Sequence, residues 1–219
     1  MPASAFSHVC HWVFDLDHTL YPPSARLFDQ IEVRMTAYVM RALGVGRDEA
    51  DQLRDRYWRS HGTTLAGLMQ VHGVDPTPYL EDVHDIDFSV LTPDLALRAA
   101  IADLPGQKIV FTNGSAPYAA KVLAARGLTG LFDGIFGVED ANYHPKPAAR
   151  AFATVFGRAG VDPARAAMFE DDPRNLAVPH QLGMRTVHVA PAPEPAPHIQ
   201  HHTNDLPRFL RSLRGTRHH

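Results

Sequence analysis

Short apolar runs recur along the chain, with polar residues and turn formers between them. Each run is five to seven residues long, and the runs cover 8–14, 108–112, 134–138, 166–170 and 185–189. Runs of this length without alternation are typical of strands buried on both faces of a sheet. We therefore predict five buried strands.

Segments with helical spacing of apolar residues separate the last four runs. They cover residues 116–128, 146–160 and 173–184, and a glycine stands at or near the end of each. Strands that alternate with helices predict a parallel sheet with right-handed crossovers. The pattern therefore indicates an α/β fold.

The alternation is interrupted once, between the first and second runs. The residues with helical spacing there are Leu27, Ile31, Tyr38, Val39 and Leu43, and helical patterns follow over 47–62 and 64–73. A normal crossover needs far less chain than this interval provides. We predict a helical domain over residues 22–90, inserted into an α/β core that comprises residues 1–21 and 91–219.

Carboxylates follow the first and fourth predicted strands. The first strand leads into Asp15 and Asp17, and the fourth leads into Glu170, Asp171 and Asp172. Ligands of open parallel sheets bind beyond the carboxyl ends of the strands. Carboxylates that converge there repel one another unless a cation lies among them, and oxygen ligands without thiolates favour Mg²⁺.

The second strand and the loop after the third supply donors for an anion. Thr112, Asn113, Gly114 and Ser115 follow the second strand, and Lys146 lies between two prolines after the third. A hydroxyl, backbone amides near a helix start and an ammonium group are suitable donors for phosphate oxygens. The sequence thus predicts a site for a phosphoryl group beside a magnesium ion.

The paired aspartates suit a two-step phosphoryl transfer. A carboxylate acts as a nucleophile by forming an aspartyl-phosphate, and Asp15 is our candidate for that role. Asp17, two residues on, would protonate the leaving oxygen and then deprotonate the attacking water.

Composition and charge narrow the class of protein. The 219 residues are 45% hydrophobic, which is enough for one sizeable core and a modest insertion. The formal charge of -3, with no long basic block, argues against a nucleic acid polymer as partner. Cys10 is the only cysteine, which excludes an intramolecular disulfide and a thiolate metal cluster. No run approaches the roughly 18 apolar residues of a membrane span, so we expect a cytoplasmic protein without a membrane partner.

Four motifs in order resemble those of the haloacid dehalogenase (HAD) superfamily. They are DLDHTLY, FTNGS, the lysine of HPKP, and FEDD. The resemblance implies a Rossmann-like parallel sheet with an inserted helical C1 cap. It also implies that Asp15 is the nucleophile and Asp17 the acid/base, and that both belong to the metal site, Asp17 through its backbone carbonyl.

The same resemblance assigns the remaining motif residues. Thr112 holds phosphate together with Asn113 and Gly114, and Lys146 steadies the charge of both nucleophile and phosphate. Asp171 binds Mg²⁺, with Glu170 close to the metal.

Several of these residues also have a purely structural interpretation. Asn113 and Ser115 are either ligands or caps of the helix that follows them. Asp172 is either a second metal ligand or a turn residue, and Asn175 stands where many members of the superfamily carry another aspartate.

The inserted segment bears on the substrate. With YWRSHGTTLAGLM in the cap and FEDDPRNL in the core, the chain is similar to the pyrimidine 5'-nucleotidase group of HAD phosphatases. Tyr57, Gly62, Thr63 and Thr64 are the cap residues expected to select the substrate, although an aromatic residue such as Tyr57 is more often part of a core than a stacking partner.

The predicted function is Mg²⁺-dependent hydrolysis of a small phosphorylated metabolite, with a pyrimidine nucleoside 5'-monophosphate as the first choice. The alternatives are another small-molecule phosphatase, acting on phosphoglycolate or a sugar phosphate, and a phosphomutase. A phosphate-binding scaffold without turnover is a third class. The dehalogenases of the superfamily usually lack the second aspartate of the first motif, so Asp17 favours phosphoryl chemistry.

Overall fold

Six parallel strands form one sheet in the computed structural model, which describes residues 2–213. The strand order is β3-β2-β1-β4-β5-β6, and the strands are β1 (His11–Phe14), β2 (Gln107–Phe111), β3 (Gly134–Phe136), β4 (Ala166–Glu170), β5 (Arg185–Val189) and β6 (His201–Thr203). The central strand β1 lies between β2 and β4, with Phe14 opposite Val110 on one side and Phe169 on the other. This is the point at which the strand order reverses, and it aligns the carboxyl ends of the three strands.

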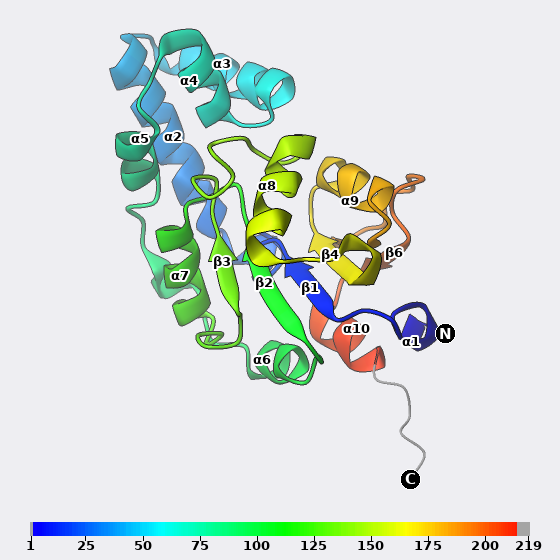
Figure 1. Cartoon of the computed structure of the whole chain (residues 1–219). Helices are drawn as coiled ribbons and strands as arrows, with labels where there is room; N and C mark the ends of the chain where they lie inside the picture. The colour runs from blue at the N-terminus through cyan, green and yellow to red at the C-terminus, as the bar shows by residue number, and fades with distance from the viewer. Residues whose placement is uncertain (1, 214–219) are drawn as a thin grey trace.

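Ten α-helices occur in the described part of the chain, and Figure 1 shows their arrangement around the sheet. They are α1 (Pro2–Ala5), α2 (Leu27–Leu43), α3 (Arg47–His61), α4 (Thr64–His72), α5 (Pro76–Val83), α6 (Leu95–Ala102), α7 (Ala116–Ala125), α8 (Ala149–Ala159), α9 (Ala177–Gln181) and α10 (Leu206–Ser212). Short 3-10 turns occur at Pro23–Ala25, Phe88–Val90, Pro163–Arg165 and Pro173–Leu176.

Alternation along β1 divides the core into two layers. Trp12 and Phe14 pack into the larger apolar cluster, to which α6, α7 and α10 contribute, while Val13 packs on the other face with Phe152 of α8. Successive side chains of a strand point to opposite faces, so each strand joins both clusters. The result is a sheet with helices on both faces, as the strand and helix pattern predicts.

Helices α2 to α5 form the unit inserted between β1 and β2 (Figure 1). Asp75 caps α5, and Gly44 and Gly73 end α2 and α4 in the left-handed conformation that favours glycine. The buried residues of this unit continue the larger cluster of the core. The fold is therefore an α/β sheet domain with an inserted helical cap.

Helix α5, strand β6 and helix α10 are elements that the hydrophobic pattern does not predict. Strand β6 is three residues long and contains two histidines, and it is recognisable only because Val187 to Val189 pair with it. Helix α10 follows directly, with Leu206 and Leu210 buried against the core. Among the described helices, none has the length and apolar character needed to cross a membrane.

Candidate active site

The nucleophile candidate lies directly beyond the end of β1. The backbone N–H of Asp15 donates to the Phe169 carbonyl at 2.9 Å, so the pairing with β4 continues past the strand and fixes the position of the side chain. Thr19 Oγ1 lies 3.2 Å from Asp15 Oδ2 and donates to it. His18 turns the chain in the left-handed region with φ of 58°, a conformation that costs energy for a residue other than glycine. This turn returns Thr19 to the carboxylate of Asp15.

Lys146 is a buried cation that joins carboxylates from two strands. Its Nζ lies 2.7 Å from Asp15 Oδ1 and 2.6 Å from Glu170 Oε2, and it donates to the Phe111 carbonyl at 3.0 Å. The side chains of Lys146 and Glu170 are each 1% exposed. Three segments far apart in sequence therefore share one buried ammonium group.

One lysine does not balance the negative charge around it. Burial, reinforced by the charge of Glu170, raises the pKa of Asp15 to about 7 although Lys146 acts in the opposite direction. Burial likewise raises the pKa values of Glu170 and Asp171. Burial alone would lower the pKa of Lys146, but Asp15 and Glu170 outweigh it and raise that pKa. The site therefore favours an additional positive charge, either protons or a metal ion.

Asp15, Glu170 and Asp171 fit a metal ion. One oxygen atom from each lies within 4.8 Å of the others. Asn175 Oδ1 is buried without a hydrogen-bond partner among the described residues, and Asn175 lines the same pocket. Three carboxylate oxygens and an unpaired amide oxygen are the donor types that a hydrated divalent cation such as Mg²⁺ prefers.

Asp17 lies in the same pocket as Asp15, but its side chain has different hydrogen-bond partners. Its Oδ1 accepts hydrogen bonds from the hydroxyls of Tyr21 and Tyr118, at 2.6 and 2.5 Å. Burial raises the pKa of Asp17, and the two hydroxyls offset part of this effect. A buried carboxyl group with a raised pKa holds a proton more readily than an exposed one, which suits an acid/base role.

The contacts in the loop after β2 distinguish residues available to a ligand from residues with a structural role. Thr112 is fully buried and its Oγ1 accepts from Gly114 N at 2.9 Å, which leaves the hydroxyl proton for another acceptor. Asn113 pairs with the backbone of Lys146 in both directions, at 2.8 and 3.1 Å. Ser115 caps α7 by accepting from Tyr118 N. Asn113 and Ser115 thus have structural side-chain contacts, and Thr112, Asn113 and Gly114 line the pocket.

The contacts of Asp172, in the loop after β4, indicate a structural role. Asp172 accepts from the backbone N–H of Arg174 at 3.0 Å and forms an ion pair with the Arg174 guanidinium at 2.6 Å. Asp171 instead lies 3.5 Å from His18 Nδ1, and its carbonyl is 2.9 Å from His188 Nε2. Asp172 therefore caps the turn, and Asp171 stays with the acidic cluster.

A pocket of about 750 Å³ joins these residues to the cap. The core residues predicted from the motifs that line it are Asp15, Asp17, Thr112, Asn113, Gly114, Lys146, Glu170 and Asp171. Gly62, Thr63 and Thr64 line it from the cap. Thr63 also caps α4, since its Oγ1 accepts from Ala66 N at 3.1 Å.

The expectation that Tyr57 helps to select the substrate is wrong, because its side chain lies away from the pocket. The ring is 2% exposed and packs against Gly67, where an added Cβ would come within 2.2 Å of Tyr57 Cγ. The hydroxyl lies 2.6 Å from His72 Nε2. The close approach of α3 and α4 at a glycine buries this aromatic ring inside the cap.

Four other side chains at or beside the site were not identified from the sequence. His18, His84 and Arg174 line the pocket, and Tyr118 contacts Asp17. The Arg174 guanidinium lies 3.7 Å from the centre of the Trp58 ring of the cap. Two of the four had a sequence signal, because His18 stands inside DLDHTLY and Arg174 inside FEDDPRNL. His84 and Tyr118 reach the site only through contacts between distant segments.

Comparison with known proteins gives a family and a fold. The pattern of haloacid dehalogenase-like hydrolases matches residues 12–183. Phosphate metabolism protein 8 of Saccharomyces cerevisiae is 26% identical over 175 residues, which cover 73% of this chain and 54% of that protein. The chain thus spans about half the length of this curated relative.

Solved structures with the same fold include different activities. A HAD phosphatase from Thermococcus onnurineus matches with a TM-score of 0.63 and 18% identity, covering 94% of this chain and 98% of that one. L-2-haloacid dehalogenase from Xanthobacter autotrophicus, with chloropropionic acid covalently bound, matches with a TM-score of 0.61 and 17% identity, covering 95% and 99%. These likenesses establish the fold, and the reaction has to be argued from the site.

Proposed function

The chain belongs to the haloacid dehalogenase-like hydrolases, and from this premise we propose that it is a phosphatase that hydrolyses small phosphomonoesters through an aspartyl-phosphate on Asp15. The supporting observation is the position of Asp17. This second carboxyl group lines the same pocket as Asp15 and is held by two hydroxyls. A departing halide needs no proton, whereas a departing alkoxide does, so an acid at Asp17 has a task only when oxygen leaves.

The reaction divides between the two aspartates. The Asp15 carboxylate attacks phosphorus, the P–O bond to the leaving group breaks, and Asp17 gives its proton to the departing oxygen. Water then attacks the phosphorus of the aspartyl-phosphate and passes a proton to Asp17. Phosphate departs, and the free Asp15 carboxylate is restored with no net change in the protein.

Lys146 and Thr112 have supporting roles in this proposal. The ammonium of Lys146, 2.7 Å from Asp15 Oδ1, orients the nucleophile and stabilises negative charge on the phosphoryl oxygens. The Thr112 hydroxyl is the donor from the β2 loop, because Thr112 lines the pocket and its Oγ1 already accepts from Gly114 N, which leaves the hydroxyl proton for a phosphoryl oxygen. None of these contacts involves the leaving group.

The metal would be held by the carboxylates of Asp15, Glu170 and Asp171 and by the Asp17 carbonyl, with Asn175 next to them. Mg²⁺, when bound, offsets the charge of the buried carboxylates and of the phosphoryl oxygens. The clustering of three carboxylates within 4.8 Å supports this assignment.

We assign residues 22–90 the role of a cap that selects the leaving group. The pocket lining from this segment includes an apolar set, Phe28, Ile31, Met35, Leu80 and Val83. An apolar wall favours a flat base over phosphoglycolate or a sugar phosphate, which would leave it without a partner. Thr63 and Thr64 supply hydroxyls beside it. We therefore propose a nucleoside 5'-monophosphate as the substrate, with a pyrimidine preferred.

Phosphate release from CMP, UMP, AMP, GMP, phosphoglycolate and a sugar phosphate, with Mg²⁺ and with EDTA, tests the proposal. We expect Mg²⁺-dependent turnover, none with Asp15→Asn, and a preference for pyrimidine nucleotides of roughly tenfold to a few hundredfold in kcat/KM, since one hydrogen bond or a modest misfit is worth ~1 to 3 kcal/mol.

Variants at Thr63, directly before α4, test whether this part of the cap causes the preference for pyrimidine nucleotides. Thr63→Ala should reduce the pyrimidine preference, and Thr63→Ser, which keeps both the hydroxyl and the α4 cap, should retain it. Equal efficiencies on all four nucleotides would contradict the pyrimidine assignment. Faster hydrolysis of phosphoglycolate would contradict the nucleotide assignment as a whole.

A further inference from the structure

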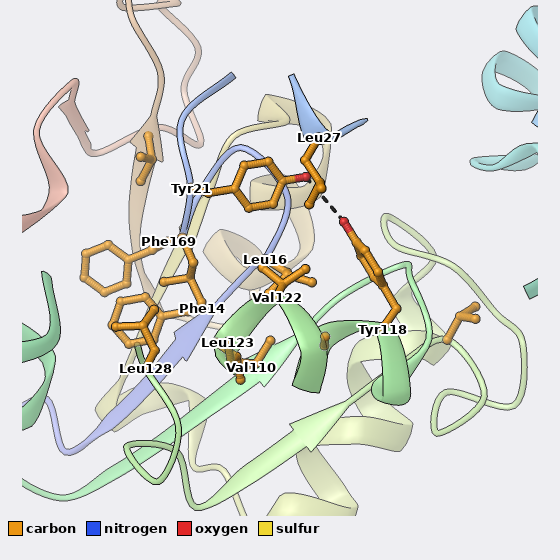
Figure 2. Packing of buried hydrophobic residues seen from close by; sticks show 14 of the residues in the cluster. Phe14, Leu16, Tyr21, Leu27, Val110, Tyr118, Val122, Leu123, Leu128 and Phe169 are labelled. Carbon is orange, nitrogen blue, oxygen red and sulfur yellow. Dashed lines mark hydrogen bonds between the residues drawn. The ribbon is translucent and has the colours of Figure 1, made fainter. Parts of the chain in front are cut away.

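Two tyrosine hydroxyls from distant segments meet at one oxygen of Asp17. Tyr21 is the last residue of the first motif, DLDHTLY, and Tyr118 lies on α7. Both donate to Oδ1, at 2.6 and 2.5 Å. Their hydroxyl oxygens are 3.4 Å apart, and Figure 2 shows the two rings pointing these hydroxyls toward one another. Each side chain is 1% exposed. The hydrogen bonds that the described residues make to Asp17 thus reach Oδ1 and not Oδ2.

The Tyr118 ring is fixed by its surroundings before any substrate binds. The His84 ring stacks on it with centroids 4.2 Å apart and planes 8° apart, and His84 Nδ1 lies 3.1 Å from Ser115 Oγ. Gly114 allows the ring to approach the β2 loop, because a Cβ there would come within 2.9 Å of Tyr118 Cδ1. A hydroxyl held in this way donates without further loss of side-chain entropy.

We propose that Tyr21 and Tyr118 are positioning residues that confine the transferable proton of Asp17 to Oδ2. The inference rests on the proposed role of Asp17 as the acid/base. A carboxylate oxygen has two lone pairs, and two O–H donors occupy both of those on Oδ1. A proton on Asp17 therefore binds Oδ2, and the same two donors stabilise the carboxylate that remains after the proton has left.

The hydroxyls of Tyr21 and Tyr118 stay protonated near neutral pH and therefore remain hydrogen-bond donors. Burial and the charge of Asp17 raise the pKa of Tyr21 and of Tyr118 above the usual tyrosine value, so neither ionises near neutral pH. In the first half-reaction the proton passes from Oδ2 to the departing ester oxygen. In the second half-reaction Oδ2 takes a proton from the attacking water, and Oδ1 accepts from the same two hydroxyls throughout.

A purely structural role for the tyrosines predicts a different result. In that case the loss of a hydroxyl would lower stability and slow every ester equally. Under the positioning role the loss appears where the leaving oxygen needs a proton. Phenyl phosphate and p-nitrophenyl phosphate separate the two, because their leaving groups have nearly the same shape while p-nitrophenolate departs readily without a proton.

The test compares Tyr21→Phe, Tyr118→Phe and the double variant, with kcat/KM as the readout because it reports the steps up to departure of the leaving group. Losing a hydrogen bond to a charged group should lower kcat/KM for phenyl phosphate by about 10- to 100-fold in each single variant, and for p-nitrophenyl phosphate by less than about threefold. The double variant should approach Asp17→Asn.

The control removes a buried hydroxyl elsewhere. Tyr57→Phe loses a 2.6 Å contact with His72 inside the cap, outside the pocket, and should leave the ratio of the two esters unchanged. If Tyr118→Phe does not fold, Tyr21→Phe decides the matter, because it leaves the stacking of Tyr118 on His84 intact.

A second readout follows the other half-reaction. With p-nitrophenyl phosphate the double variant should release a burst of about one equivalent of nitrophenolate per site before a slower steady rate, since water attack also needs Oδ2. Equal losses on both esters, or no loss on either, would overturn the positioning role while leaving phosphatase activity in place. A wild-type protein that hydrolyses neither ester would overturn the proposed function itself.

Discussion

Replacing Lys146 with methionine should remove the buried ammonium group that offsets part of the charge of Asp15 and Glu170. The Lys146 side chain is 1% exposed, and its Nζ contacts Asp15 Oδ1, Glu170 Oε2 and the Phe111 carbonyl at 2.7, 2.6 and 3.0 Å. Methionine is similar in length, so the change removes charge without leaving a large cavity. Two buried carboxyl groups and one carbonyl lose their donor together.

The magnitude follows from these contacts. Removing one partner of a buried ion pair costs roughly 3 to 5 kcal/mol, and an unpaired buried carbonyl adds ~1 kcal/mol. Lys146 lowers the pKa of both Asp15 and Glu170, so its loss raises these pKa values further. The folded variant then binds more protons than the unfolded chain, and its stability falls as pH rises. Each further unit of pKa adds about 1.4 kcal/mol, so the loss at pH 8 should exceed that at pH 5.5 by at least ~1 kcal/mol.

Urea unfolding in EDTA at both pH values measures this effect, with phosphate release as the activity assay. Lys108→Met is the control, because Lys108 Nζ donates to the carbonyls of Leu104 and Gly106 near the surface. We expect a Tm lower by roughly 10 °C for Lys146→Met, given about 2 to 4 °C per kcal/mol for a chain of this size, and at least ~100-fold slower turnover. A destabilisation that is equal at the two pH values would refute the argument that Lys146 offsets the charge of Asp15 and Glu170.

Three further measurements address the metal, a buried histidine and the cap. Mg²⁺ should raise the Tm more at pH 8 than at pH 5.5, because metal ligands bind deprotonated and the pKa of Asp15 is raised to about 7; equal shifts would contradict this. Burial lowers the pKa of His84 to about 4, so the folded state binds fewer protons than the unfolded chain between pH 4 and 6.5. Acidification from pH 7 to 5 should therefore cost about 2 kcal/mol at this residue, and urea titration of His84→Gln should lack that loss. Gly67→Ala, whose Cβ would lie 2.2 Å from Tyr57 Cγ, should lower the unfolding free energy by ~3 kcal/mol or more, whereas Gly157→Ala, with open space around it, should not lower it at all.

The five strands β1 to β5 and the residues at their ends were determined by the sequence alone. Each of them stands in a short apolar run, and the spacing of the intervening helices requires parallel crossovers. Once the sheet is parallel, Asp15, Thr112 and Glu170 must emerge at the same edge, and the structure places them in one pocket. These features are local or follow from topology, so no knowledge of side-chain packing is needed to predict them.

The environment of each of these residues was decided by the tertiary structure. Tyr118 reaches Asp17 across 101 positions of sequence, and His84 stacks on Tyr118 from the end of α5. Tyr57 turned inward because Gly67 lets α4 approach α3, and Asp172 paired with Arg174 instead of joining the acidic cluster. Hydrogen bonds and ring contacts between distant segments depend on how helices pack against the sheet, and packing depends on the shapes of many side chains at once. A pattern read along the chain contains the residue types for this chemistry, but only the folded chain brings particular atoms within bonding distance.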